Sequence, residues 1–588
     1  MKILIVGGGG REHALAWKCA GSPEVETIYC APGNAGIAEL AECIAIDAND
    51  IVALKDFALE NNVDLTVVGP EDPLAAGIVD VFEKVGLKVF GPTKAAAQIE
   101  GSKSFAKRLM LKYNIPTAMG RTFTSYAHAL LYLETMDFPV VVKADGLAAG
   151  KGVVVCRTRE EAEDVLDRIM NQQIFGDAGA AVLIEDYLPG EEASFIAFTD
   201  GKNVIPLPAS QDHKAVHEGD TGPNTGGMGA VSPAPVIDIV MRQKIMNQVM
   251  IPTVKAMAAE KIPYKGVLYA GLMISGDKVN VVEFNCRFGD PETQPILMRT
   301  RNDIVPLMTA CIDGGLDNYS VDIDPRPAAC VIMAAKGYPG QYDKGMVVSG
   351  LETIRKIDGI EVFHSGTAMK EGQIVTAGGR VLGVTATGET LGQAVSRAYE
   401  AIPALSFDNE YHRPDIGHRA IKRLKTPPLV GIIMGSDSDL SVMAAAAETL
   451  RQFEIPYEIT VCSAHRTPAE ASVFAKGARE RGMKIIIAGA GHAAHLAGAM
   501  AAHSSLPVIG VPIDSSALSG FDALLSTVQM PPGIPVATMA VGKPGAKNAA
   551  VFAAQILSVS DPAIAGKVDA YKTKMAAEVN RKAEGFAG

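Results

Sequence analysis

Apolar residues in this chain gather into short runs that alternate with longer helix-like segments, and this rhythm occurs twice. The first runs are KILIVG at 2–7, ETIYCA at 26–31, DLTVVGP at 64–70 and LKVFGP at 87–92. Such a series predicts βαβ units built on a parallel sheet. The rhythm restarts with LVGIIMG at 429–435 and continues to about residue 558. We therefore expect two separate α/β regions in one chain.

The segment between these regions has a different pattern. A helix is expected from Ser102 to about Tyr113, and FPVVVKADGLAAGKGVVVC at 138–156 places two apolar runs around a glycine-rich turn, which predicts an antiparallel hairpin. Further expected elements are a strand at 181–188, β pairs within 194–209 and 266–285, and a smaller α+β region at 325–425. Paired prolines in LKTPPL at 424–429 mark a linker. The last 30 residues, rich in Ala, Lys and Glu, predict a terminal helix that packs on a neighbouring subunit.

Composition indicates a globular protein of several domains. The 588 residues are 48% hydrophobic and 20% charged, and at roughly 150 residues per domain we expect about four structural units. The net charge of −12 argues against a broad nucleic-acid surface, which needs a basic face. The eight cysteines form no CxxC pairs, which favours reduced thiols in the cytoplasm over a disulfide framework or a zinc ribbon. We expect neither a membrane span nor a cleavable signal.

The glycine turn GGGGREH at 7–13 follows the first predicted strand. The dinucleotide pattern GxGxxG would require glycine at positions 7, 9 and 12, but residue 12 is Glu. The pattern therefore fails at the position that permits close helix packing. A phosphate bound at the N-terminus of the following helix, assisted by Arg11, fits these residues better than a nicotinamide cofactor.

The turn DGLAAGKGV at 145–153 resembles a phosphate loop but breaks the Walker pattern. It is one residue short before the Gly-Lys pair, and Gly152 stands where Ser or Thr would take magnesium. Two interpretations stay open at this point. One is a glycine-rich flap over nucleotide phosphates, with Lys143 and Lys151 as cations, and the other is an ordinary hairpin with solvated lysines.

A metal site is predicted in VVEFNCRFGDPETQ at 281–294. Glu283 and Asn285 alternate along a strand, so both side chains point to one face. Hard oxygen ligands of this type suit magnesium that carries nucleotide phosphates. Arg287 can neutralise a transferring phosphoryl group or a substrate carboxylate. The glycine-rich stretch at 210–235 is too long for a plain hairpin, and its polar groups could close over a substrate.

Several strings in this part of the chain carry a family resemblance: VGGGGREHALAW, APGNAG, VVGPEDPLAAG, EGSKSFAK, KADGLAAGKGV, SQDHK, GPNTGGMGA and EFNCRFGDPETQ. Through them, residues 1 to about 425 closely resemble the phosphoribosylamine–glycine ligase family of ATP-grasp enzymes. One departure is Val231, where a Tyr is common. The resemblance implies a βαβ domain at 1–101, an ATP-grasp domain at 102–324 and a small α+β domain at 325–424. It also implies that ATP phosphorylates the carboxylate of glycine and that the amine of 5-phosphoribosylamine attacks the acyl phosphate.

The same resemblance assigns roles residue by residue. Lys103, Lys143 and Glu185 would belong to the ATP site, with Glu191 against the ribose or adenine, and Lys151 of the flap is counted with them. Glu283 and Asn285 would hold Mg²⁺ or Mn²⁺. Gly9, Gly10 and Asn34 would lie near phosphoribosylamine. Asp212 and Arg287 would lie near glycine or the acyl phosphate, and Arg287 is the catalytic candidate.

In the second α/β region, polar loops directly follow apolar runs: GSDSD at 435–439, SAHRTP at 463–468 and AGAGHAAHLAG at 488–498. Loops at the carboxyl ends of parallel strands are where open α/β sheets bind ligands. Small residues let the backbone approach a phosphate, and the imidazole of His465 suits reversible proton transfer. A metal at His492 and His495 is disfavoured because no carboxylate or Cys follows at short range.

A second resemblance is carried by MGSDSD, SAHRTP, AGAGHAAHL, LPVIGVP, ALSG, STVQMP and GIPVATMAVG. Through these strings, residues 429 to about 560 closely resemble the N5-carboxyaminoimidazole ribonucleotide mutase family, which implies a flavodoxin-like, three-layer α/β domain. Ser436 and Asp439 would hold the ribose-phosphate portion and Arg466 the phosphate. His465 would be the general acid and base, and His495 would help line the pocket. The resemblance implies no metal, nucleotide or other cofactor for this half.

His492 departs from this second family, in which Gly is common at the position, and leaves the shape of the pocket open. A direct carboxylation of aminoimidazole ribonucleotide therefore stays open for this half. Two alternatives for the chain as a whole also stay open: an ATP-grasp ligase for another acid, and one half serving as an inactive scaffold or sensor. The expected boundaries are a linker at 425–428 and a mutase domain with its C-terminal helix at 429–588. The resemblance suggests an octamer through the mutase domain, with small-molecule substrates and no nucleic-acid or membrane partner.

Overall fold

The computed structural model describes residues 1–146 and 152–584, and the chain divides into two compact units. The first unit consists of Met1–Ile237, Lys244–Ser275 and Val279–Ile421, and the second consists mainly of the residues from Lys422 onward. Lys151, which was expected on the flap, lies outside the described residues. Each unit is described by itself.

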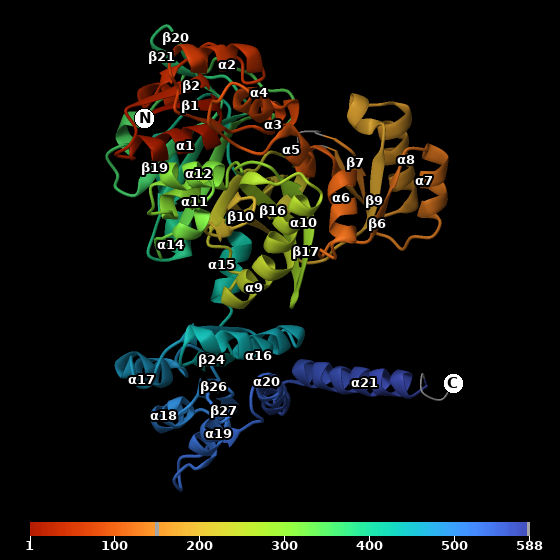
Figure 1. Ribbon diagram of the computed structural model, residues 1–588, viewed down its shortest axis with the longest axis vertical. Coiled ribbons are helices and arrows are strands. Elements are labelled where there is room, and N and C mark those ends of the chain that lie inside the picture. The colour runs from red at the N-terminus through yellow and green to blue at the C-terminus, as the bar shows by residue number, and fades with distance from the viewer. Residues whose placement is uncertain (147–151, 585–588) are drawn as a thin grey trace. The chain divides into compact units, whose positions relative to one another are not determined.

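The first unit begins with a five-stranded parallel sheet of order β3-β2-β1-β4-β5 (Figure 1). Its strands are β1 (Lys2–Gly7), β2 (Thr27–Pro32), β3 (Glu42–Cys43), β4 (Leu65–Val68) and β5 (Val89–Phe90). Four of them follow the predicted apolar runs. Because β1 lies between β2 and β4, its carboxyl end is the switch point at which such sheets bind ligands. Helix α1 (Gly10–Ala20) begins there.

Residues 120–186 form an antiparallel sheet of order β6-β9-β7-β8. Its strands are β6 (Gly120–Phe123), β7 (Val140–Ala144), β8 (Val153–Cys156) and β9 (Val182–Asp186). Strands β7 and β8 pair antiparallel with Lys143 opposite Val153, which confirms the predicted hairpin. Helices α7 (Tyr126–Leu133) and α8 (Arg159–Leu166) bury their apolar faces on this sheet, and together these elements form one side of the first unit (Figure 1).

A third sheet of order β11-β10-β16-β17 carries the predicted metal ligands. Its strands are β10 (Glu191–Asp200), β11 (Val204–Pro206), β16 (Lys265–Ser275) and β17 (Lys278–Asn285). Side chains alternate along a strand, so Glu283 and Asn285 share one face of β17. The segment that follows helix α6 (Lys103–Lys112) is tied to this strand, because Thr117 Oγ1 donates to the carbonyl oxygen of Val281 at 2.9 Å.

The glycine-rich stretch at 210–235 supplies two strands to the sheet of the small α+β region. That sheet has the order β12-β15-β18-β22-β19, with β23 paired to β18. The strands are β12 (Gln211–Asp212), β15 (Gly229–Ser232), β18 (Ala328–Ala335), β19 (Ile360–His364), β22 (Arg380–Thr387) and β23 (Glu410–Tyr411). Between β12 and β15 the chain forms a hairpin of β13 (Ala215–His217) and β14 (Thr221–Asn224). The stretch is thus anchored at both ends rather than free.

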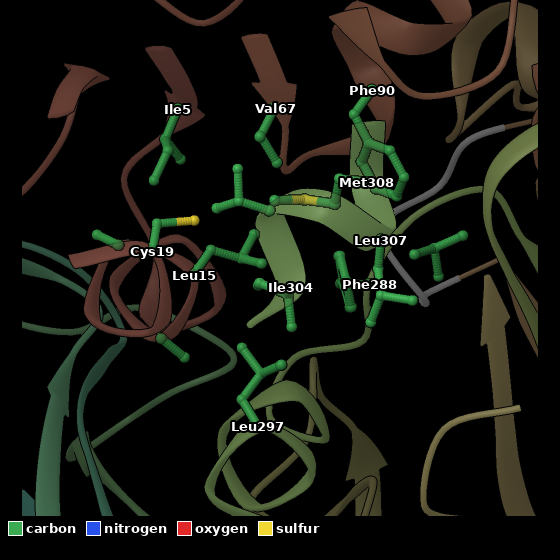
Figure 2. Close-up of a cluster of buried hydrophobic side chains, with 14 of the residues drawn as sticks. Ile5, Leu15, Cys19, Val67, Phe90, Phe288, Leu297, Ile304, Leu307 and Met308 are labelled. Atoms are coloured by element: carbon green, nitrogen blue, oxygen red, sulfur yellow. The ribbon is translucent and has the colours of Figure 1, made fainter. Parts of the chain in front are cut away.

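One apolar core joins the first sheet to helices from much later in the chain (Figure 2). Ile5 of β1, Leu15 of α1 and Val67 of β4 pack with residues of α11 (Thr293–Arg299) and α12 (Ile304–Asp313). The contributing later residues are Phe288, Leu297, Ile304, Leu307 and Met308, all of them buried. Burying apolar surface contributes about 25 cal/mol per Å², so this core fixes the start of α1 against the segment that follows β17.

The second unit is built on one parallel sheet of order β25-β24-β26-β27-β28. Its strands are β24 (Val430–Met434), β25 (Tyr457–Val461), β26 (Ile485–Gly491), β27 (Val508–Ile513) and β28 (Ala537–Thr538). Alternate residues of the central strands enter two different cores: Ile432 and Ile487 face α16 (Leu440–Gln452) and α20 (Lys543–Ser558), while Ile433 and Ile486 face α17 (Pro468–Gly477) and α18 (Leu496–His503). This is the expected three-layer α/β fold.

Two further helices complete the second unit. Helix α19 (Phe521–Val528) follows the loop after β27, and α21 (Pro562–Glu584) is the predicted terminal helix. Helix α21 buries Ile564 and Val568 near its start and extends away from the sheet of its unit (Figure 1). Within the described part of the chain, no helix combines the length and apolar character required to cross a bilayer.

Candidate functional sites

The glycine turn at the start of α1 is shaped by Glu12. Its Oε2 accepts a hydrogen bond from the Gly9 backbone N–H at 2.6 Å, and a Cβ at Gly7 would lie 2.7 Å from its side chain. Glu12 thus fills the space that the third glycine of a dinucleotide fingerprint would leave open. Arg11 is buried, with Nε 2.6 Å from Glu12 Oε1 and Nη1 donating to the Phe288 carbonyl oxygen at 3.1 Å. In this structure the guanidinium of Arg11 is directed into the protein, so its expected phosphate contact stays a prediction.

Asn34 lies beside the glycine turn, but its amide group is used structurally. Its Nδ2 donates to the carbonyl oxygens of Gly8 at 2.9 Å and His364 at 2.8 Å, and its Oδ1 accepts the backbone N–H groups of Gly36 and Ile37. Asn34 therefore ties the turn after β1 to the end of β19. A side chain with this many backbone partners shapes the predicted phosphoribosylamine pocket.

Gly10 is closely surrounded at the same position. A Cβ there would lie 2.5 Å from Ser365 Oγ and 2.7 Å from Gln294 Nε2. Asp290 is also nearby: Gln294 Nε2 donates to its Oδ1 at 2.8 Å, and Arg380 Nη2 of β22 donates to its Oδ2 at 2.8 Å. The site thus places a carboxylate at the N-terminus of α1, a group that the sequence argument did not single out.

The predicted nucleotide residues Lys143 and Glu185 meet as a buried ion pair. Lys143 Nζ lies 2.6 Å from Glu185 Oε2 and donates to the Val282 carbonyl oxygen at 2.9 Å. Lys107 pairs with the other oxygen, Glu185 Oε1. Burial lowers the pKa of Lys107, and Glu185 opposes that shift. The sequence argument missed Lys107, although it lies one helical turn after Lys103 in EGSKSFAK.

Lys103 lies at the N-terminus of α6, next to the start of the flap. Its Nζ donates to the Gly146 carbonyl oxygen at 2.8 Å. Burial lowers the pKa of Lys103, and the charge of Glu283 opposes this shift. The flap is anchored here, because Asp145 accepts the Ser104 backbone N–H at 3.0 Å and the Ser104 hydroxyl at 2.5 Å. Lys103 and Glu283 thus lie close enough for their charges to interact.

The carboxylate of Glu283 on β17 is held in its charged form. Burial opposes ionisation, but Lys214, Lys143 and Lys103 outweigh it and lower the pKa of Glu283 to about 2. Lys214 Nζ lies 3.4 Å from Glu283 Oε1 and also pairs with Glu192. Lys214 was quoted in the SQDHK string but was not assigned a role.

The donor set on β17 fits a divalent cation. Glu283 supplies an ionised carboxylate, and Asn285 on the same face can supply an amide oxygen, both of them hard ligands. Among the described residues, no group of three or more His, Cys, Asp or Glu side chains gathers into a metal cluster. One carboxylate with one amide suits an ion that carries its remaining ligands on nucleotide phosphates and water. Glu191, expected against the nucleotide, begins β10 opposite Ile274 of β16.

Arg287 is already neutralised by two carboxylates. Its Nε donates to Glu71 Oε2 at 2.8 Å, and its Nη2 lies 3.3 Å from Glu100 Oε1. Burial disfavours a charged Glu71, yet Arg287 lowers the pKa of this carboxyl to about 2. Glu71 begins α3 (Glu71–Ala76) and Glu100 belongs to α5 (Lys94–Gly101). In this conformation Arg287 joins the segment after β17 to the first domain.

Asp212 lies beside Gly227, which in turn lies against Asp290 and Pro291 after β17. A Cβ at Gly227 would lie 2.8 Å from Asp212 Oδ1, and Oδ1 accepts the His213 backbone N–H at 2.6 Å. Burial, with the nearby charge of Glu292, raises the pKa of Asp212 well above its usual range. Arg380 secures the neighbouring chain by donating to the carbonyl oxygen of Gly226 at 2.6 Å. Asp212 and Asp290 are thus brought to one place.

In the second unit, the polar loops meet at the carboxyl ends of β24, β25 and β26. Ser436 begins the loop after β24: its backbone N–H donates to Asp439 Oδ2 at 3.1 Å, and Asp439 is buried. Burial raises the pKa of Asp439, while the N–H groups of Ser436 and Gly435 and the charge of Arg466 oppose this shift. Arg466 Nη2 donates to the Gly435 carbonyl oxygen at 3.1 Å. The residues predicted to bind the ribose and the phosphate therefore lie next to one another.

His465 and His495 form a pair across two of these loops. His465 Nε2 lies 2.9 Å from His495 Nδ1, with the rings at 82° and their centroids 5.1 Å apart. Ser463 Oγ accepts the backbone N–H groups of His465 at 3.3 Å and Arg466 at 3.1 Å, which fixes the loop after β25. Both imidazoles are exposed. The geometry brings the predicted acid–base group to the switch point between β24 and β26.

Family models match this chain in four segments. Those of phosphoribosylglycinamide synthetase match residues 1–100 (N domain), 101–293 (ATP-grasp (A) domain) and 328–419 (C domain), and that of AIR carboxylase matches residues 429–578. A phosphoribosylamine–glycine ligase of Vibrio parahaemolyticus is 54% identical over 426 residues, which are 72% of this chain and 99% of that relative.

Solved structures are also similar to the first unit. The phosphoribosylamine–glycine ligase of Thermotoga maritima has a TM-score of 0.63 and 32% identity, covering 71% of this chain and 100% of its own. The biotin carboxylase domain of a Hydrogenobacter thermophilus 2-oxoglutarate carboxylase has a TM-score of 0.55 with 18% identity. The match covers 70% of this chain and 91% of that domain's chain. The second likeness shows the fold alone. The expected ATP-grasp fold is confirmed for the first unit.

Proposed function

We infer the function of this chain from one premise: it belongs to the phosphoribosylamine–glycine ligase family and carries an AIR carboxylase domain at residues 429–578. It is a bifunctional enzyme of purine biosynthesis that uses ATP. The observation that carries this conclusion is the presence of two polar sites, one around Glu283 and one around His465, in units that have separate cores.

The first unit ligates glycine to 5-phosphoribosylamine. The γ-phosphoryl group of ATP passes to the glycine carboxylate, the amine attacks the resulting acyl carbon, and phosphate leaves. Lys103 and Lys143 would bind nucleotide phosphates, and Glu283 with Asn285 would hold Mg²⁺ or Mn²⁺, which supplies charge neutralisation on the phosphates. Phosphoryl transfer of this kind needs positioning and charge rather than a protein nucleophile.

For the substrate residues of the ligase we propose the roles that the family resemblance implies. Gly9 and Gly10 lie at the N-terminus of α1, where an anionic phosphate is favoured, although the Gly9 N–H donates to Glu12 in this structure. Asn34 would shape that pocket through its hydrogen bonds to the surrounding backbone. Asp212 would lie near glycine. For Arg287 we propose a charge-matching role toward the acyl phosphate, which requires that it exchange Glu71 or Glu100 for the substrate.

The second unit converts N5-carboxyaminoimidazole ribonucleotide to 4-carboxy-5-aminoimidazole ribonucleotide without metal, nucleotide or other cofactor. Ser436 and Asp439 would bind the ribose phosphate and Arg466 the phosphate. His465 would protonate the departing carbamate nitrogen and, after carbon dioxide adds at C4, remove the proton from that carbon. His495, 2.9 Å from His465, would line the pocket and orient the imidazole. General acid–base catalysis of this type contributes roughly 10²–10⁴-fold.

One assay separates this proposal from a direct carboxylase. The full chain is supplied either with the carboxyamino substrate or with aminoimidazole ribonucleotide and bicarbonate at equal concentrations. We expect faster product formation from the carboxyamino substrate. Faster turnover of aminoimidazole ribonucleotide with bicarbonate would assign the second unit to direct carboxylation.

For the domain division we propose the boundaries expected from the sequence, with a βαβ domain at 1–101, an ATP-grasp domain at 102–324, a small α+β domain at 325–424 and the second enzyme from 429. Strands β12 and β15 qualify this division, because they belong in sequence to the second part but join the sheet of the third: β15 pairs with β18, and β12 pairs with β15. The eight cysteines are free thiols in the described structure, which supports a reducing compartment such as the cytoplasm.

We also propose that the second unit assembles the chain into an octamer. Helix α19 exposes Phe521, Leu525 and Val528 at helical spacing, and an apolar stripe of this kind marks an interaction surface. Helix α21 exposes Met575 and Val579 beyond its buried start. Sedimentation of the full chain at micromolar concentration tests the proposal, and a monomer would refute it.

A further inference from the structure

The turn after β26 contains an imidazole that the proposed reaction does not use. His492 has a φ of +53°, a left-handed conformation that is uncommon for residues other than glycine and costs some steric strain for most of them. Strain of this kind persists where the surrounding structure holds it in place, and it gathers at functional sites. His492 is exposed, so burial of its ring does not explain the conformation.

We propose that His492 is a positioning residue of the second active site. It ties the turn 492–495 to the loop after β27 through Ser515, and this contact sets where His495 stands against His465. The inference rests on the proposed function of the second unit and adds a residue to it.

The contact between the two loops is local and specific. His492 Nδ1 lies 3.3 Å from Ser515 Oγ. Ser515 is held close to the chain at Gly491, because a Cβ at Gly491 would collide with its hydroxyl. Strands β26 and β27 are neighbours in the sheet, with Gly491 opposite Ile513. The imidazole–hydroxyl contact therefore joins the carboxyl ends of two adjacent strands, just beyond their last ladder pair.

A short path leads from this contact to the acid–base pair. The His492 carbonyl oxygen accepts the Ala494 backbone N–H at 2.9 Å, and the His495 N–H donates to the Ala493 carbonyl oxygen at 2.8 Å. His495 is the N-cap residue of α18, and its Nδ1 lies 2.9 Å from His465 Nε2. A shift of the turn at His492 would move His495 and change the hydrogen bond that orients His465.

The loop on the other side of the contact is itself fixed. Ser516 Oγ donates to Asp522 Oδ1 at 2.7 Å and accepts the Leu518 backbone N–H at 3.2 Å. The hydroxyl of Ser516 lowers the pKa of Asp522, and the charge of His492 contributes in the same direction. Ser515 is thus presented to His492 by a loop that is pinned to the start of α19.

The test measures conversion of the carboxyamino substrate by the full chain and its variants, with kcat and KM determined separately. In His492→Gly the φ is accommodated without strain, so we expect the unfolding midpoint to stay the same or rise. We expect kcat to fall about tenfold, less than the roughly 10²-fold that a 1 Å misplacement of a reacting group can cost, with KM within about twofold. Glycine-dependent ATP cleavage should be unchanged.

Two further variants separate positioning from a general structural role. Asn tolerates the left-handed conformation and its amide can reach Ser515, so His492→Asn should recover kcat to within about threefold of the original chain. Ser515→Ala should match His492→Gly, and the double variant should lose no more than either single change, since coupled residues are non-additive.

Each contrary result overturns the proposal. Wild-type kcat in His492→Gly, failure of His492→Asn to recover activity, or multiplication of the single losses in the double variant would each show that the contact does not position His495. A wild-type chain inactive with this substrate would contradict the proposed function as well, which distinguishes the two failures.

Discussion

The two sites of this chain manage charge in opposite ways. Around Glu283, Glu185 and Arg287 the charged groups are largely withdrawn from solvent and matched by partners from distant segments. Around His465 and Arg466 the groups are exposed and come from loops at one sheet edge. A site for ATP and a metal ion must balance several charges, whereas a site that moves one proton needs one well-placed base. The difference predicts distinct responses to substitution.

The largest expected effect is on the second site. His465→Asn removes the only group proposed to carry the proton, so mutase turnover should fall by about 10³-fold. Glycine-dependent ATP cleavage should persist at the original rate, because the first unit has its own core. Both rates are measured on the same preparation, and parallel loss of both would contradict independent sites.

The reciprocal change acts on the first site. Glu283→Gln removes the ionised ligand and should lower glycine-dependent ADP release by about 10²-fold, the cost of losing one preorganised electrostatic group. Mutase turnover should not change. Direct titration with Mn²⁺ and nucleotide should show weaker metal binding. Unchanged Mn²⁺ affinity would remove Glu283 from the proposed metal site.

A third prediction concerns the unfolding free energy of the first unit, and it compares a buried ion pair with an exposed one. Lys107→Met leaves Glu185 with Lys143 as its partner, so the cost should be below the roughly 3–5 kcal/mol of an uncompensated buried charge. We expect a lower unfolding free energy for the first unit, with the transition of the second unit unchanged. Lys112→Met is the matched control: its pair with Glu260 is solvent-exposed, and surface pairs contribute little. Equal effects of the two changes would contradict the role of burial.

The smallest effect is a pH dependence confined to the first unit. Burial is the main cause that lowers the pKa of His13 to about 3 and that of His364 to about 4. Since both folded values lie below the unfolded value of about 6.5, the unfolded chain takes up protons first as pH falls. Stability is therefore full above about pH 6.5 and is lost below it, by up to about 1.4 kcal/mol per pH unit for each imidazole.

Denaturant unfolding between pH 7 and pH 5 checks this prediction. His13→Asn should flatten the pH dependence of the first transition. A first transition that does not respond to pH in the original chain would show that these imidazoles are not held neutral.

The elements that the sequence predicted are those whose pattern is local. The runs KILIVG and LVGIIM became β1 and β24 because continuous apolar runs suit strands buried on both faces. His465 and Glu283 could also be singled out locally, because His465 lies in the loop after β25 and Glu283 lies near the end of β17. Long-range pairing was not accessible: nothing near Lys107 indicates that it shares Glu185 with Lys143, and nothing in 210–235 shows that β15 pairs with β18.

The hydrogen-bond contacts change the interpretation of two residues, Arg11 and Asn34. Arg11 was expected to assist a phosphate, but the turn of α1 directs it toward Glu12 and Phe288. Asn34 was expected near the substrate, and its amide is occupied by backbone groups from two segments far apart in the chain. A polar side chain next to a glycine turn is consistent with ligand binding or with support of the turn, and only its partners decide between them.

The central claim is that one chain holds two independent active sites. The most direct measurement follows both reactions on a single sample of the full chain: ADP release that depends on glycine and phosphoribosylamine, and conversion of the carboxyamino substrate. We predict that both activities are present in the same purified fractions of the protein. Saturating either site with its substrates should leave the turnover of the other site unchanged. Absence of one activity from a chain that performs the other would contradict the account.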